Sequence, residues 1–320
     1  MDVIAANITA AIDAINDVVW GYVLIYGLLA VGVYFSIRLR FLQLFKFGEF
    51  IRSVTRTPEK DSHGITPIQA LTTSLASRVG TGNIAGVAVA VYTGGPGALF
   101  WMWVVAFLGM ATAYAESTLA QIYKVSDHDG LYRGGPAFYI TRGLNAPWAG
   151  ALFSIILLVV FGLVFNAVQA NAIAESLNES FQLDRIQIGV GVAILSALVI
   201  FGGIRNIARV AEVVVPFMAV AYLGVALWVM VANIDRVPAV IGLIIKSAFG
   251  FEQAAGGVMG SMAAAMLNGV KRGLFSNEAG MGSAPNIAAV AIPSPHHPSS
   301  QGFVQALGVF IDTILICTAT

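Results

Sequence analysis

Five residues of unexpected chemistry interrupt an apolar stretch near the start of the chain, ITPIQALTTSLASRVGTGNIAGVAVAVYTGGPG, and these are Arg78, Gly80, Thr81, Gly82 and Asn83. Glycine lets the backbone leave helical geometry, while threonine and asparagine supply polar side chains beside it. Within a membrane, such backbone is tolerated only where protein buries it or where it lines a cavity. The stretch therefore predicts a helix that is interrupted at a binding site.

A second apolar segment, 253–292, carries a similar mixture of glycines and polar residues between apolar flanks: Asn268, Gly269, Gly273, Ser276, Asn277, Glu278, Gly280, Gly282, Ser283 and Pro285. Half-helix N-termini attract anionic groups, and exposed carbonyls attract cations. Two interrupted helices in corresponding positions of two halves indicate the substrate site of a transporter. A zwitterionic amino acid and a sodium ion both suit such a site.

A short sequence echo links the two interrupted segments. NIAGVAV at 83–89 matches NIAAVAI at 286–292 at five of the seven letters. Chance matching is the competing explanation in a chain this rich in Ala, Val and Ile. An inverted repeat predicts that the two segments cross the membrane in opposite directions.

Composition defines the solvent in which the chain folds. It is 58% hydrophobic and 11% charged, with a mean hydropathy of +0.81. A soluble domain has roughly 25% charged residues. We therefore expect an all-α, multi-pass integral membrane protein surrounded by lipid, with no nucleic-acid partner. The single cysteine, Cys317, excludes an intramolecular disulfide or a multi-cysteine metal site.

Apolar runs bounded by charged or turn residues predict the helices, at about 20 residues a span. The expected segments are 18–37, 66–92, 98–123, 149–174, 186–202, 210–232, 253–292 and 301–320. Residues 41–55 fit either a helix in the membrane interface or an amphipathic connector. Lys and Arg favour one set of alternate loops, including Lys60, and this asymmetry predicts an N-terminus outside the cell.

Several polar residues within the apolar segments have two interpretations. Arg78 is expected to pair with Glu116, Glu278 or Asp312, because intramembrane charges are usually paired or line a path. Gln169, in FNAVQANAIA, either bonds a neighbouring helix or contacts substrate. Residues 80–86 spell GxGxxxG without a preceding strand, which argues against a dinucleotide site. No set of acid, base or nucleophile residues indicates an enzyme.

Four strings resemble the alanine or glycine:cation symporter family: GTGNIAGVA, YRGGPAFYI, GLFSNEAGMGSAPNIAA and QALGVFIDT. The resemblance spans residues 66–313 and implies a LeuT-like, five-plus-five inverted-repeat fold preceded by one extra helix. It also implies a substrate and cation site made by the two broken helices and the third core helix. The implied residues are Thr81, Gly82, Asn83, Gln169, Phe275, Ser276 and Asn277, with sodium held through Thr81, Asn83 and Asn277.

The resemblance also implies a domain organisation and a function. Residues 1–64 would form the extra helix and an interfacial helix, 65–235 the first five-helix repeat, and 236–320 the incomplete start of a second repeat, truncated after the seventh core helix of the fold. The implied function is sodium-coupled symport of alanine or glycine across the cell membrane, with no cofactor besides the coupling ion. The alternatives are proton coupling through Glu116, Glu278 or Asp312, a channel, and a non-transporting fragment.

Overall fold

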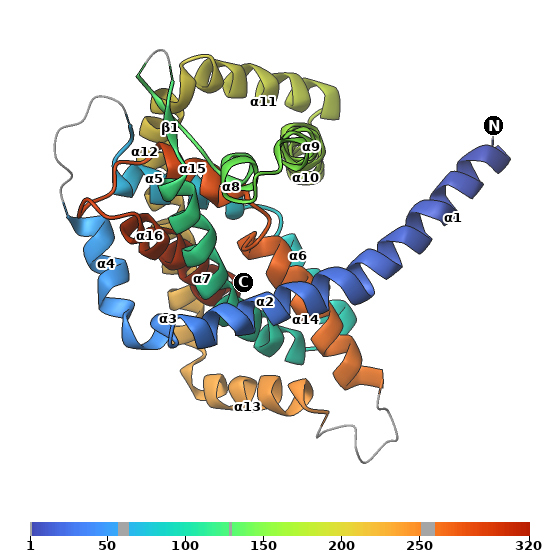
Figure 1. Cartoon of the computed structure of the whole chain (residues 1–320). Coiled ribbons are helices and arrows are strands. Elements are labelled where there is room, and N and C mark those ends of the chain that lie inside the picture. The colour runs from blue at the N-terminus through green and yellow to red at the C-terminus, as the bar shows by residue number, and fades with distance from the viewer. Residues whose placement is uncertain (1, 57–63, 128–129, 251–259) are drawn as a thin grey trace.

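The computed structural model describes residues 2–56, 64–127, 130–250 and 260–320, and the described part is almost entirely helical (Figure 1). Residues 253–259 of the second interrupted segment, and Lys60, lie outside it. The helices of the first half are α1 (Asp2–Val18), η1 (Val19–Leu24), α2 (Ile25–Arg38), α3 (Leu42–Phe45), α4 (Phe47–Thr55), α5 (Pro67–Arg78), α6 (Ala85–Gly94), α7 (Gly97–Ile122) and α8 (Pro136–Gly143).

The remaining helices are α9 (Pro147–Val159), η2 (Val160–Phe165), α10 (Asn166–Phe181), α11 (Arg185–Ile200), α12 (Gly203–Ala232), η3 (Ile234–Arg236), α13 (Val237–Ala248), α14 (Gly260–Asn277), α15 (Ser283–Val290), α16 (Ser299–Val309), η4 (Phe310–Ile316) and α17 (Cys317–Ala319). A small antiparallel hairpin pairs β1 (Val125–Ser126) with β2 (Tyr132–Arg133).

Among the described residues, five continuous helices are long and apolar enough to cross a membrane: Thr9–Arg38, Gly97–Ile122, Pro147–Phe181, Gly203–Ala232 and Ser299–Ala319. This confirms the expected multi-pass helical membrane protein. π-Helical turns lie within three of the five, at η1, η2 and η4. The first helix begins at Asp2 rather than near residue 18, and Figure 1 shows α1 projecting from the rest of the molecule.

Helix α7 forms the centre of the packed core and contacts α2, α13, α14, α15 and α16. Its buried alanines Ala106, Ala113 and Ala120 repeat at every second turn and are all 0% exposed. Small residues let helix backbones approach closely in a membrane protein. The sequence of α7 therefore allows the broken helices and α16 to pack around one continuous helix.

The two broken helices lie side by side and run in opposite directions. Helix α6 packs against α14, while α5 packs against α15. At one end, the backbone N–H of Ile65 donates to the carbonyl of Val290 at 3.2 Å, and Ile292 donates to Ile65 at 2.9 Å. The first half of each helix therefore meets the second half of the other.

Residues 41–55 form α3 and α4, and the apolar side of α4 packs on α16. Phe50 is fully buried. The ring centroids of Phe47 and Phe310 are 5.0 Å apart, and those of Phe50 and Phe303 are 5.8 Å apart. Much of the apolar face of α4 is therefore covered by protein.

Candidate functional site

The first interruption covers residues 79–84, between α5 and α6. Helix α5 begins at a capping box, in which Thr66 and Gln69 each accept a hydrogen bond from the other's backbone N–H, and Pro67 follows the cap. It ends at Arg78, just before the glycines. The predicted interruption of the helix at Gly80–Asn83 is confirmed.

The second interruption covers residues 278–282, between α14 and α15. Gly280 and Gly282 have φ angles of +87° and +84°, in the left-handed region that glycine adopts without a steric penalty. Glu278 also lies there, at φ +53°. The run of residues after Asn277 therefore ends the helix for a local steric reason, and this interruption is also as predicted.

A buried hydrogen-bonded cluster joins the first interruption to α14 and η4. The side-chain amide of Asn83 donates to Ser276 Oγ at 3.0 Å and to Asp312 Oδ1 at 2.7 Å. Ser276 in turn donates to Asp312 Oδ2 at 2.8 Å, and Thr313 donates to the same oxygen at 2.7 Å. All four residues are 0% exposed. We call Asn83, Ser276, Asp312 and Thr313 the central cluster.

Gln169 of α10 reaches the first interruption from the other side. Its Oε1 accepts from the backbone N–H of Thr81 at 3.2 Å. A side chain at Gly80 would clash with it, since an added Cβ would lie 2.7 Å from Gln169 Nε2. The structure thus shows a hydrogen bond between Gln169 and a neighbouring segment, which is the first of the two interpretations. The bonded backbone has left helical geometry.

Phe275 covers Gly82 and belongs to an aromatic stack. An added Cβ at Gly82 would meet the Phe275 ring at 3.2 Å. The Phe275 ring stacks on Phe165 with centroids 5.1 Å apart, and Phe165 stacks on Phe161 at 4.8 Å. The ring is therefore held in place over the first interruption.

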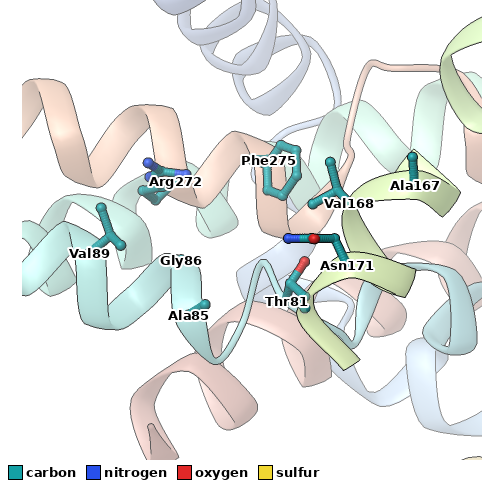
Figure 2. A pocket seen from close by; sticks show the side chains of 10 residues that line it. Thr81, Ala85, Gly86, Val89, Ala167, Val168, Asn171, Arg272 and Phe275 are labelled. Atoms are coloured by element: carbon teal, nitrogen blue, oxygen red, sulfur yellow. The ribbon is translucent and has the colours of Figure 1, made fainter. Parts of the chain in front are cut away.

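A cavity of about 500 Å³ lies between α6, α10 and α14. Its lining residues are Thr81, Ala85, Gly86, Val89, Ala167, Val168, Asn171, Ala172, Arg272 and Phe275. Figure 2 shows the polar ends of Thr81 and Asn171 beside the same space as the Phe275 ring. Within the described part of the chain, the buried Thr81 hydroxyl has no hydrogen-bond partner, so it is free to bind a ligand.

Asn277 lies apart from the central cluster. Its Oδ1 accepts from the backbone N–H of Ala279 at 3.0 Å, within the second interruption. Its side chain faces Gly109 of α7, where an added Cβ would lie 3.6 Å from the amide. The structure therefore brings Asn83 and Ser276 together, and places Asn277 on the neighbouring side of α14.

Sequence reasoning did not assign Asp312, Thr313, Cys317 or Thr320 to the binding site. Cys317 Sγ lies 3.2 Å from Ser276 Oγ and 3.3 Å from the Asn83 amide nitrogen. Thr320 donates to the Asn83 carbonyl at 3.0 Å. The signal available in the sequence is an acid inside an apolar helix, but such an acid can equally be a partner of Arg78 or a proton carrier.

Buried charges surround the interruptions. Arg78 is 3% exposed, and among the described residues no carboxylate lies within 4 Å of its guanidinium, so the expected pairing with Glu116, Glu278 or Asp312 is not a direct ion pair. Its Nη1 donates instead to the Gln305 carbonyl at 3.4 Å. Glu278 accepts from Ser77 at 3.3 Å and from Ser283 at 2.5 Å, and so ties α5 to the start of α15. Glu116 of α7 accepts from the backbone N–H of Gly280 at 3.2 Å.

Several helices that could cross a membrane, two interrupted helices that lie side by side, and an adjoining cavity are typical of membrane transporters of small solutes. The sequence profile of the sodium:alanine symporter family matches residues 5–320. The chain belongs to this family, whose members are transporters and not enzymes.

Three relatives illustrate the family. The chain is 51% identical over 305 residues to the amino-acid carrier protein AlsT of Bacillus subtilis, covering 95% of this chain and 64% of the relative. It is 49% identical over 306 residues to the probable sodium/glutamine symporter GlnT of B. subtilis, covering 95% and 63%. It is 40% identical over 321 residues to the sodium/alanine symporter AgcS of Methanococcus maripaludis, covering 98% and 70%. The chain thus spans under two thirds of the length of the first two.

Proposed function

We propose that this chain is part of a carrier that moves a small neutral amino acid into the cell together with sodium. The observation that supports it most is the meeting of two broken helices at one buried carboxylate, beside a cavity that could hold an amino acid. Family membership supports sodium as the coupling ion. Alanine and glycine are the proposed substrates.

The central cluster is the proposed sodium site. Asp312 supplies one carboxylate, and the hydroxyls of Ser276 and Thr313 supply neutral oxygens. Hard cations prefer oxygen ligands. Among the described residues there is no group of three or more His, Cys, Asp or Glu side chains that could hold a metal ion. One negative charge with neutral oxygens suits a monovalent cation, with Asn83 orienting the carboxylate.

The amino acid is proposed to bind against the first interruption. The Thr81 hydroxyl and the backbone beside Gly82 are available to its polar groups, and Gln169 holds that backbone. Phe275 limits the room for a side chain. In this assignment Thr81 serves the amino acid, and Asn277 supports the second interruption rather than sodium.

Transport would follow alternating access. Sodium would bind at the central cluster and fix the two interruptions, and the amino acid would then bind beside it. Entry of one positive charge gains about 2.3 kcal/mol per 100 mV of membrane potential. The antiparallel pairing of the broken helices supports a LeuT-like inverted-repeat arrangement, with repeats beginning near residues 65 and 236 and the N-terminus outside the cell membrane.

The direct test is equilibrium binding of radiolabelled alanine to the purified chain, in sodium and then in choline. We expect saturable binding only in sodium, weakened in both Asn83→Ala and Ser276→Ala. Ser154→Ala is the control, because within the described residues the Ser154 hydroxyl bonds only the Gly150 carbonyl of its own helix. Wild-type affinity in both cluster variants would refute the site. Competition by glycine and by glutamine ranks the substrates.

Proton coupling is the second candidate. Glu116 and Glu278 are 7% and 2% exposed and lie at the second interruption. A relative that is 47% identical over 309 residues, in B. subtilis, is named a putative sodium/proton-dependent alanine carrier protein. Alanine uptake into vesicles that contain the carrier would test this mechanism. Uptake that does not depend on sodium but is abolished by a protonophore would select proton coupling.

A further inference from the structure

The cavity beside the first interruption has a charged residue to which the proposed function gives no role. Among the described residues that line this cavity of about 500 Å³, Arg272 alone is charged. Figure 2 shows Arg272 and Phe275 on α14, at the edge of the space that they share with Thr81 and Asn171. A solute in the cavity is therefore exposed to the field of one positive charge.

The Arg272 side chain lies against the first turn of α6. A Cβ added at Gly86 would lie 3.9 Å from Arg272 Cδ and 3.6 Å from the Thr81 carbonyl oxygen. Along α14, Arg272 precedes Phe275 by three residues and Ser276 by four, which places all three on one side of the helix. Arg272 thus lies next to the space in which the amino acid is proposed to bind.

The guanidinium of Arg272 has no acidic partner within the described part of the chain. None of the ion pairs found there, within 4 Å, involves this residue. Its side chain is half-buried and keeps its positive charge and five N–H donors. Charged side chains in membrane segments usually pair with an opposite charge or face a solute pathway. Because Arg272 faces the cavity, an anionic group of a bound solute can serve as its partner.

The carboxylate of an amino acid fits this position. A guanidinium binds a carboxylate through two parallel hydrogen bonds, and such charge-assisted bonds are about twice as strong as neutral ones. The same charge repels the ammonium group of the amino acid. The carboxylate is therefore directed toward α14, and the ammonium toward the uncharged oxygens of Thr81 and Asn171, which line the cavity as well.

We propose that Arg272 binds the carboxylate of the transported amino acid, and so sets the orientation of the substrate and excludes amines that lack a carboxylate. This inference rests on the proposed function, because it takes the 500 Å³ cavity as the site of the amino acid. The positive charge also disfavours sodium within the cavity. Sodium is thereby directed to the central cluster, where Asp312 supplies the opposite charge.

Competition against radiolabelled alanine, with the full chain in sodium, tests this role. The competing ligands are alanine and alaninamide, in which a neutral amide of similar size replaces the carboxylate. Arg272→Gln removes the charge, and Arg272→Lys keeps the charge without the planar fork. Lys271→Gln is the matched control, because Lys271 is the adjacent cation, is also half-buried and does not line the cavity.

We expect Arg272→Gln to weaken alanine binding at least about tenfold, as for the loss of a hydrogen bond between charged groups. Alaninamide affinity should stay within about twofold of wild type, because alaninamide makes no such bond. The preference for alanine over alaninamide therefore falls about tenfold or more in Arg272→Gln. It should fall less in Arg272→Lys and stay unchanged in Lys271→Gln.

A second measurement uses the wild-type chain and so does not depend on the folding of a variant. Phenylglyoxal modifies arginine side chains, and peptide mass spectrometry gives the rate at each position. Saturating alanine in sodium should slow modification of Arg272 about tenfold, because about nine tenths or more of the sites are then occupied. The rate at Arg142, which is exposed on α8, should not change.

Two results would overturn the role of Arg272 and leave the proposed function intact. One is an Arg272→Gln variant that binds alanine in sodium with the wild-type preference over alaninamide. The other is an Arg272 modification rate that saturating alanine does not change. Wild-type chain that binds alanine equally well in choline would instead contradict the proposed function.

Discussion

Replacing Asp312 with Asn removes the negative charge of the central cluster and keeps its shape. The carboxylate accepts three side-chain hydrogen bonds of 2.7–2.8 Å, from Asn83, Ser276 and Thr313. Removing one partner of a buried charge pair costs about 2–5 kcal/mol. We take the lost binding free energy of a sodium ion as about 3 kcal/mol. Because about 1.4 kcal/mol is a tenfold change in affinity, we expect sodium affinity to fall about 100-fold.

The assay is alanine binding measured as a function of sodium concentration. The sodium midpoint should rise about 100-fold in Asp312→Asn, while alanine affinity at saturating sodium changes much less. Asp184→Asn is the isosteric control, because Asp184 is an exposed cap of α11 remote from the cluster. A midpoint within about twofold of wild type would remove Asp312 from the sodium site, since this is below about 0.5 kcal/mol.

Three further predictions concern the parts that surround the cluster. Gly80→Ala should displace Gln169 and weaken alanine binding about tenfold, as expected for one lost hydrogen bond, whereas Gly191→Ala, with open space around it, should bind normally. Phe275→Ala should raise the affinity for glutamine relative to alanine in a competition assay, and an unchanged ratio would show that the ring does not limit substrate size. Thr66→Ala removes the α5 cap and should cost about 1 kcal/mol, seen as a lower melting temperature with sodium affinity retained.

Both interruptions could be predicted from the sequence because their causes are local. Gly80 and Gly82 stand beside polar residues within an apolar run, and Gly280 and Gly282 do the same after Glu278. A helix in lipid cannot leave such groups unpaired, so composition alone indicates where the backbone must be buried or line a cavity. The long helix at 97–122 could be predicted for the opposite reason, because no run of glycines and polar residues interrupts its apolar sequence.

The partners of the interruptions could not be predicted in the same way. Asp312 lies far along the chain from Asn83, and only tertiary packing of η4 brings it within 2.7 Å. Ser276 and Asn277 are adjacent and similar in polarity, yet helical geometry turns them to different sides of α14. Helices α8 and α13 were missed because they are short and follow turns, so length and apolar periodicity gave little signal.

Asn83 couples the two broken helices through its hydrogen bonds. Its Oδ1 accepts from the backbone N–H of Gly80 at 3.1 Å, which fixes the shape of the first interruption. Its amide nitrogen bonds Ser276 and Asp312, which belong to α14 and η4. One side chain therefore joins the fold of the first interruption to the position of α14, the helix that leads into the second interruption. A cation at the proposed site on Asp312 would change the hydrogen bonding of Asn83, and so would act on the backbone where the amino acid is proposed to bind.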